Sequence, residues 1–127
     1  MIESYVNKEI FNSNNKKLSP VIKQYLSIKE NNEDCIIFYR LGDFYELFLD
    51  DAIVGSRILD LTLTGKDCGV GERAPMCGIP FHAYESYAQR LIERGYKVAI
   101  CEQTDEIRNG LVQREIVRII TPGTVVE

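Results

Sequence analysis

The sequence predicts a single domain of the mixed α/β class, and three observations support this prediction. Its 127 residues are enough for one hydrophobic core and too few for two ordinary domains. Hydrophobic residues make up 45% of the chain and charged residues 27%, which is the balance of a globular domain. Segments with helical spacing of apolar residues alternate with short apolar runs that are typical of strands. Residues 1–17 are expected to form a lead-in segment and residues 18–127 the domain.

Three helices are predicted from capping signals and from apolar residues repeated at helical spacing. The first, over residues 19–32, opens with Ser-Pro, an N-cap followed by a first helical residue. The second begins at Asp50, where two acidic residues favour a helix N-terminus, although Gly55 weakens it by about 1 kcal/mol relative to Ala. The third covers about residues 83–94.

Strands are predicted where short apolar runs lack helical spacing. Residues 35–41 are nearly continuously apolar, and residues 44–49 are expected to pair with them as a hairpin across Gly42 and Asp43. Residues 65–80 contain four glycines and two prolines and are expected to form a long surface loop. Three further strands are predicted at residues 61–64, 97–101 and about 113–120, with a polar loop between the last two.

The charge and the cysteine spacing exclude several functions. The chain has 15 basic and 19 acidic residues, a net charge of −4, which disfavours tight DNA binding through its own phosphate contacts. Its four cysteines lack Cys-x-x-Cys spacing and are expected to be reduced thiols. No apolar run approaches the ~18 residues of a membrane span, and the N-terminus lacks a signal-peptide pattern, so we expect a cytoplasmic protein without a membrane partner.

Enzyme motifs are absent or incomplete. His82, the single histidine, has no partners in a Ser-His-Asp or Cys-His pattern. The glycine-rich match at residues 69–74 runs into Pro75 instead of opening a helix, and no complete phosphate-binding loop is present. We therefore expect no enzymatic activity and no cofactor for this chain. A metal-dependent nuclease is a weaker alternative, because no acidic residue has a lysine two positions later. The remaining candidates for Mg²⁺ ligands are Asp43, Glu46, Asp50 and Asp51.

The strand predicted at residues 44–49 places an acidic side chain beside aromatic rings. Alternation puts Phe44, Glu46 and Phe48 on one face and Tyr45, Leu47 and Leu49 on the other. A buried Glu46 without a partner would cost several kcal/mol, so its face is expected to be partly open. Two interpretations follow: a core face with Glu46 at its rim, or an exposed wedge at Phe44.

Four sequence blocks, in order, resemble the N-terminal mismatch-recognition domain of the MutS family of DNA mismatch-repair proteins: FYRLGDFYELF, PMCGIPFHA, YKVAICEQ and REIVRIITPGT. The resemblance covers about residues 18–124. It implies a mixed sheet of about five to six strands flanked by about three helices, and a function of sensing mispaired or unpaired bases in duplex DNA. It also implies that the partners are mismatched double-stranded DNA and the remaining domains of a MutS-type protein, which dimerises and uses ATP and Mg²⁺ outside this chain.

The resemblance assigns the recognition of the mispair to two residues. Phe44 and Glu46 match a Phe-x-Glu motif in which the Phe enters the minor groove and stacks on a mispaired base, while the Glu hydrogen-bonds to that base. The physical reason is independent of the family: a mispair stacks poorly, so a kink and an inserted ring cost less there than at a Watson–Crick step. Such a wedge tests the deformability of the DNA.

Four further contacts are implied by the resemblance. Lys66 and Arg114 match positions where the family places basic residues near DNA, and Met76 and His82 lie in the block expected to approach the minor groove. Each has an ordinary alternative, a solvated base for Lys66 and a core or capping role for the others. Arg118 alternates with Arg114 on one strand face and is a candidate salt-bridge partner. The competing function for the chain is a protein-interaction module that retains the fold without autonomous DNA binding.

Overall fold

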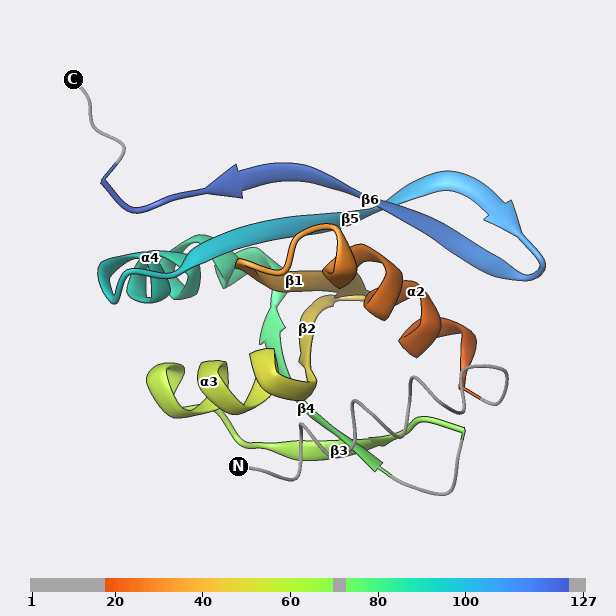
Figure 1. The fold of residues 1–127 in the computed structure, drawn as a ribbon, viewed down its shortest axis with the longest axis horizontal. Coiled ribbons are helices and arrows are strands. Elements are labelled where there is room, and N and C mark those ends of the chain that lie inside the picture. The colour runs from red at the N-terminus through yellow and green to blue at the C-terminus, as the bar shows by residue number, and fades with distance from the viewer. Residues whose placement is uncertain (1–17, 70–72, 124–127) are drawn as a thin grey trace.

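The chain forms a six-stranded mixed sheet with helices packed against it (Figure 1). The structure is a computed structural model that describes residues 18–69 and 73–123, so the predicted lead-in segment, residues 1–17, lies outside the described residues. In chain order the elements are α2 (Pro20–Glu30), β1 (Cys35–Leu41), β2 (Phe44–Phe48), α3 (Leu49–Leu59), β3 (Thr64–Asp67), β4 (Arg73–Pro80), the 3₁₀ helix η2 (Phe81–Ala83), α4 (Tyr84–Glu93), β5 (Lys97–Arg108) and β6 (Leu111–Ile120).

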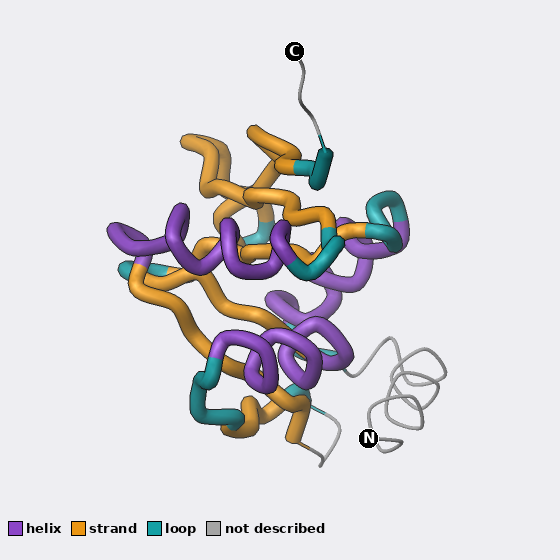
Figure 2. Tube along the Cα trace, turned by 90° about the vertical axis from the view of Figure 1, so that its left-hand side faces the viewer, coloured by secondary structure: helices purple, strands orange, loops and turns teal. Residues whose placement is uncertain are grey.

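The order of the strands across the sheet is β3-β4-β2-β1-β5-β6. β1 pairs antiparallel with β2 and parallel with β5, and the other neighbouring strands are antiparallel. Figure 2 shows the molecule turned by 90°, with the helices in purple packed against the strands in orange. β1 is central and nearly all buried, which agrees with its almost continuous apolar sequence.

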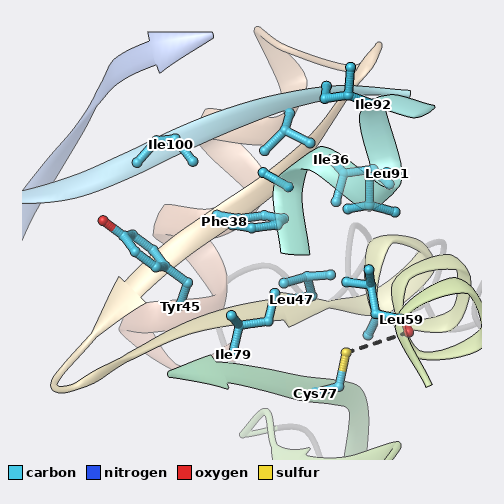
Figure 3. Close-up of a cluster of buried hydrophobic side chains, with 13 residues drawn as sticks. Ile36, Phe38, Tyr45, Leu47, Leu59, Cys77, Ile79, Leu91, Ile92 and Ile100 are labelled. Atoms are coloured by element: carbon cyan, nitrogen blue, oxygen red, sulfur yellow. Dashed lines mark hydrogen bonds between the residues drawn. The ribbon is translucent and has the colours of Figure 1, made fainter. Parts of the chain in front are cut away.

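Two hydrophobic clusters hold the layers together, one on each face of the sheet. The cluster on the α2 side joins Ile22 and Tyr25 of α2 to Ile37, Tyr39 and Phe48 of the strands. The cluster on the other side joins α3 and α4 to the sheet (Figure 3), and its largest members are Phe38, Tyr45, Leu47, Leu59, Ile79, Leu91 and Ile100. All four cysteines are buried reduced thiols, as expected from their spacing.

The elements with strong local signals are confirmed. Helix α2 begins after Ser19, whose Oγ accepts a hydrogen bond from the Ile22 N–H at 3.4 Å. β1 covers the predicted residues, β2 pairs with it in a hairpin, and α4 lies within the predicted third helix. Within residues 18–69 and 73–123, the structure contains no helix that is long and apolar enough to cross a membrane.

The predicted loop over residues 65–80 is wrong. β3 and β4 occupy most of this segment. β4 pairs with the whole of β2, from Phe44 opposite Pro80 to Phe48 opposite Met76. The predicted strand at residues 61–64 is also misplaced, because β3 begins only at Thr64. The glycine and proline content suggested a loop, but these residues fit a strand here. Pro80 is the last residue of β4, and Gly78 lies where the side chain of Glu46 leaves little room.

Two smaller expectations also differ from the structure, and one glycine has a packing role that the sequence does not show. β5 continues to Arg108 in a long exposed hairpin with β6, so the predicted polar loop after residue 101 is strand instead. Leu49 joins the α2-side cluster, away from Tyr45 and Leu47, because its positive φ of 54° ends the alternation where α3 begins. Gly55 is needed for packing, since a Cβ there would overlap Leu47 Cδ2.

Candidate nucleic-acid interface

Five of the six predicted site residues lie on one face of the sheet, the face that α2 partly covers. Directly paired residues of neighbouring strands share a face, as do residues two apart in a strand. Glu46 pairs with Gly78, and Met76 pairs with Thr64, two residues from Lys66. On the other side Tyr39 pairs with Glu46 and with Cys101, and Gln103 pairs with Arg114. The register therefore aligns Phe44, Glu46, Met76, Lys66 and Arg114 on that face.

Phe44 lies at the end of the β1–β2 hairpin, opposite Leu41 and Pro80. Its side chain is 44% exposed, whereas Phe48 on the same face is 0% exposed. The face is thus core at Phe48 and open at Phe44. Of the two interpretations considered for this strand, the structure agrees with an exposed ring at Phe44.

Glu46 lies between these two rings and is partly buried. A Cβ added at Gly78, its cross-strand neighbour, would lie 3.0 Å from Glu46 Oε1 and 3.2 Å from Oε2, so the carboxylate occupies the space that a side chain at residue 78 would fill. Oε1 is buried and has no hydrogen-bond partner among the described residues. Burial raises the pKa of Glu46, and the positive charge of Lys66 opposes that shift. Glu46 is therefore a carboxylate with unused hydrogen-bonding capacity at the edge of the core.

Lys66 and Met76 lie on β3 and β4, on the same side of this carboxylate in the sheet. Lys66 lies on the edge strand β3, is partly buried, and is the cation that acts on Glu46. Met76 is also partly buried and packs against the α2-side cluster. Its position agrees with a core role as well as with an approach to DNA.

Arg114 is held by contacts within the domain. Its Nε donates to the Arg40 carbonyl oxygen at 2.7 Å, and one Nη donates to Gln24 Oε1 at 2.9 Å and to the Val112 carbonyl oxygen at 3.0 Å. Its guanidinium carbon lies 4.5 Å from the centre of the Tyr39 ring. These contacts agree with the structural alternative for Arg114.

Arg118 does not share a face with Arg114, as strand alternation had predicted. A register shift of β6 against β5 at Ile100 and Cys101 reverses the alternation between the two arginines. The predicted salt bridge is confirmed, because Arg118 donates to Glu85 at 3.0 Å and also to the Tyr84 hydroxyl at 3.2 Å.

His82 lies apart from the other five residues, in η2. It is exposed, and its ring centre lies 6.4 Å from that of Phe81. Because Pro80 pairs with Phe44, η2 begins directly beside the open end of the hairpin. His82 is therefore at the same end of the sheet as Phe44 without belonging to the face that carries it.

The four acidic residues considered as Mg²⁺ ligands do not form a metal centre. Among residues 18–69 and 73–123, no three His, Cys, Asp or Glu residues are grouped where they could hold a metal ion. Asp51 is 5% exposed and is already bound by the Lys29 ammonium at 3.0 Å, the Tyr25 hydroxyl at 2.9 Å and the Ile37 N–H at 3.0 Å. This acid stabilises the fold.

An open hollow of about 460 Å³ lies between α2 and the tip of the β5–β6 hairpin. Lys23, Gln24 and Arg108 are among the residues that line it, and none of the six predicted site residues does.

Sequence analysis alone missed Tyr39 and Gly78, the two neighbours of Glu46. Gly78 belongs to the segment that was expected to be a loop, and Tyr39 lies in the middle of a strand read as entirely core. The strand alternation that identified Glu46 carries no information on cross-strand partners, which depend on register.

Comparisons with known proteins identify the family of the chain. The family described as MutS domain I matches residues 19–127. The DNA mismatch repair protein MutS of Acetivibrio thermocellus is 61% identical over 112 residues, which cover 87% of this chain and 13% of that protein. MutS of Ruminiclostridium cellulolyticum is 56% identical over 112 residues, with the same coverage, and MutS of Clostridioides difficile is 57% identical over 113 residues, covering 87% and 12%. The chain thus spans about an eighth of the length of these relatives. It belongs to the MutS domain I family.

Proposed function

We propose that this chain is a DNA mismatch-recognition module. The observation that supports the proposal most strongly is the pair formed by Phe44, an exposed ring at the end of a hairpin, and Glu46, two residues away, whose Oε1 has no hydrogen-bond partner among the described residues. Phe44 enters the minor groove at a step that is easily unstacked, and Glu46 accepts a hydrogen bond from the displaced base. The relatives in which the domain occurs are named DNA mismatch repair proteins.

The charge of Glu46 and the net charge of the chain fit selectivity better than affinity. Glu46 repels phosphates, and the chain as a whole has a net charge of −4. We therefore expect the isolated chain to bind matched duplex no more tightly than the ~10⁻⁴–10⁻⁶ M of nonspecific complexes at physiological salt. Stronger binding requires cations from elsewhere in a longer protein, and we propose that the partners of the domain are the other domains of a MutS protein, in a dimer.

The decisive experiment compares mismatched with matched duplexes of the same length at low salt. It uses the chain itself and a chimera in which this domain replaces the equivalent segment of the Acetivibrio thermocellus protein, which is 61% identical to it. Phe44→Ala removes a stacking contact worth ~1–3 kcal/mol per base, so the preference for mismatched DNA is expected to fall by about 5- to 150-fold. Glu46→Ala removes both a base contact and a repulsive charge, so matched DNA is expected to bind as well as before or better, while the preference falls.

The matched control is Tyr96→Ala, which removes another exposed aromatic ring, 37% exposed, between α4 and β5 and outside the predicted face. A Phe44→Ala chimera that kept the full preference for mismatched DNA would refute the proposal. The competing function, a protein-interaction module without autonomous DNA binding, is favoured by the negative charge alone. It predicts that neither the chain nor the chimera distinguishes the two duplexes.

A further inference from the structure

The turn that carries Phe44 is exposed and needs support from elsewhere. Gly42 and Asp43 form it, both are exposed, and Gly42 has a positive φ of 63°. Phe44 itself is too exposed to fix the hairpin by its own packing. Contacts on the opposite face of the sheet supply that support.

The support begins at Arg40, two residues before Gly42. Its Nε donates to the Gly42 carbonyl oxygen at 2.6 Å, and one Nη donates to both carboxylate oxygens of Glu102 on β5, at 3.2 and 3.1 Å. The guanidinium carbon also lies 4.1 Å from the centre of the Phe81 ring. One side chain therefore joins the turn to β5 and to η2.

Two further hydrogen bonds complete this connection. The Tyr45 hydroxyl, on the residue paired with Arg40, donates to Glu102 Oε2 at 2.6 Å. Burial, reinforced by the carboxylate of Glu102, raises the pKa of Tyr45 to about 12, so the hydroxyl keeps its proton and the donor role at neutral pH. The Phe81 N–H donates to the Asp43 carbonyl oxygen at 2.9 Å. The carbonyl oxygens of both turn residues, Gly42 and Asp43, thus accept hydrogen bonds.

We propose that Arg40 is a positioning residue for mismatch discrimination, which fixes the direction of Phe44 by holding the Gly42–Asp43 turn between Glu102 and Phe81. The inference rests on the proposed function. A ring held in a fixed direction can act as a wedge between bases. A ring on a mobile turn loses conformational freedom when it binds, and it can move aside at a base step that resists unstacking. A rigid turn raises the free-energy cost of inserting the ring into matched DNA relative to mismatched DNA, so it affects selectivity.

The chemistry requires arginine at this position. The planar guanidinium presents several N–H groups in fixed directions and stacks on an aromatic face, so it reaches the turn, Glu102 and Phe81 at once. A lysine ammonium keeps the charge but presents neither the planar face nor the fixed fork of donors. Arg40→Lys is therefore expected to loosen the turn while it retains the charge and most of the packing.

The test compares Arg40→Lys with Arg118→Lys in the chimera. Arg118 is a matched control because it also binds a glutamate and a tyrosine hydroxyl, Glu85 and Tyr84, and it has no contact with the hairpin among the described residues. Arg40→Lys is expected to lower the ratio of mismatched to matched affinity by roughly 2- to 12-fold, the range that corresponds to ordering one flexible side chain. It is also expected to speed amide hydrogen exchange at residues 42–44. Arg118→Lys is expected to change neither.

Glu102→Gln provides a second variant if Arg40→Lys does not fold, and it is expected to shift both quantities in the same direction. The proposal is overturned if exchange at residues 42–44 is unchanged, or if it speeds up while the affinity ratio stays at the wild-type value.

Phe44→Ala separates this inference from the proposed function. If Phe44→Ala abolishes the preference and Arg40→Lys leaves it at the wild-type value, only the role of Arg40 is refuted. If Phe44→Ala also preserves the preference, the proposed function is refuted with it.

Discussion

Removing Phe44 and removing Phe48 should have very different effects on stability, although the two residues lie on the same strand and the same face. Fully burying a Phe side chain is worth about 1.5–3 kcal/mol. Phe44 keeps 44% of its surface exposed, so a little over half of that amount, about 1–2 kcal/mol, is at stake in Phe44→Ala. Phe48 is 0% exposed and makes edge-to-face contacts with Tyr25 and Tyr39, with ring centres 5.1 and 5.5 Å away. Phe48→Ala is expected to cost about 3–5 kcal/mol.

Urea and thermal unfolding of the two variants beside the wild type measure this difference. In a chain of 127 residues 1 kcal/mol corresponds to about 4 °C in melting temperature, so the two variants should be clearly separated. Phe44→Ala should remain folded at the temperatures used for DNA binding, which makes its binding defect interpretable. Equal losses of stability, or a larger loss for Phe44→Ala, would show that the ring of Phe44 belongs to the core and would remove the basis of the wedge.

The remaining predictions concern buried charge and close packing. Burial raises the pKa of Glu46 above its ordinary value of 4.5, so the folded state binds this proton more readily than the unfolded state and the ionised carboxylate destabilises the fold. Glu46→Gln should therefore stabilise the domain at pH 7, and this advantage should shrink as the pH falls through the raised pKa toward 4.5, as measured by denaturation at several pH values. Asp51→Ala should cost about 3–5 kcal/mol because it removes the side-chain acceptor of the buried Ile37 N–H and leaves the partly buried Lys29 ammonium without its counter-charge. Asp34→Ala, in an exposed pair with Lys97, is its control and should leave the melting temperature nearly unchanged. Gly55→Ala should lower the melting temperature, because overpacking costs about 1–3 kcal/mol and outweighs a helix-propensity gain of about 1 kcal/mol.

Elements specified by neighbouring residues could be predicted from the sequence. The Ser19 cap, the apolar run of β1 and the two-residue turn at Gly42 all depend on a few consecutive residues, and all three are present in the structure. The exposed end of the strand that contains Phe44 followed from one acidic residue on an otherwise apolar face. In each case the signal and the structure it specifies lie within a few positions of each other.

β3 and β4 could not be predicted in this way. Four glycines and two prolines over residues 65–80 are typical of a loop, and only the pairing with β2 makes the segment a strand. Gly78 shows the reason. A glycine normally weakens a strand, but here it leaves room for the carboxylate of Glu46 from the neighbouring strand. Such a requirement arises from a residue 32 positions away and leaves no local pattern.

The grouping of the site residues on one face also depended on register. Phe44 and Glu46 are two residues apart, whereas Lys66 and Met76 reach the same face only through the pairing of β2, β4 and β3. The opposite error arose for Arg114 and Arg118, where regular alternation predicted one face and a single register shift separated them. Alternation is reliable within an undistorted strand and fails at the first bulge.

The alternation of side chains in the hairpin separates two roles, leaving a recognition surface open and holding the hairpin in place. These roles conflict if they fall on one face. A ring that is to enter DNA must stay exposed and a carboxylate that is to meet a base must stay unpaired, so neither Phe44 nor Glu46 adds much to stability. The intervening residue, Tyr45, points to the other face, where its hydroxyl and Arg40 both bind Glu102. The hairpin can therefore be held firmly from one side while the other side stays open, and a loss of stability at the open side is offset by contacts on the opposite face of the sheet.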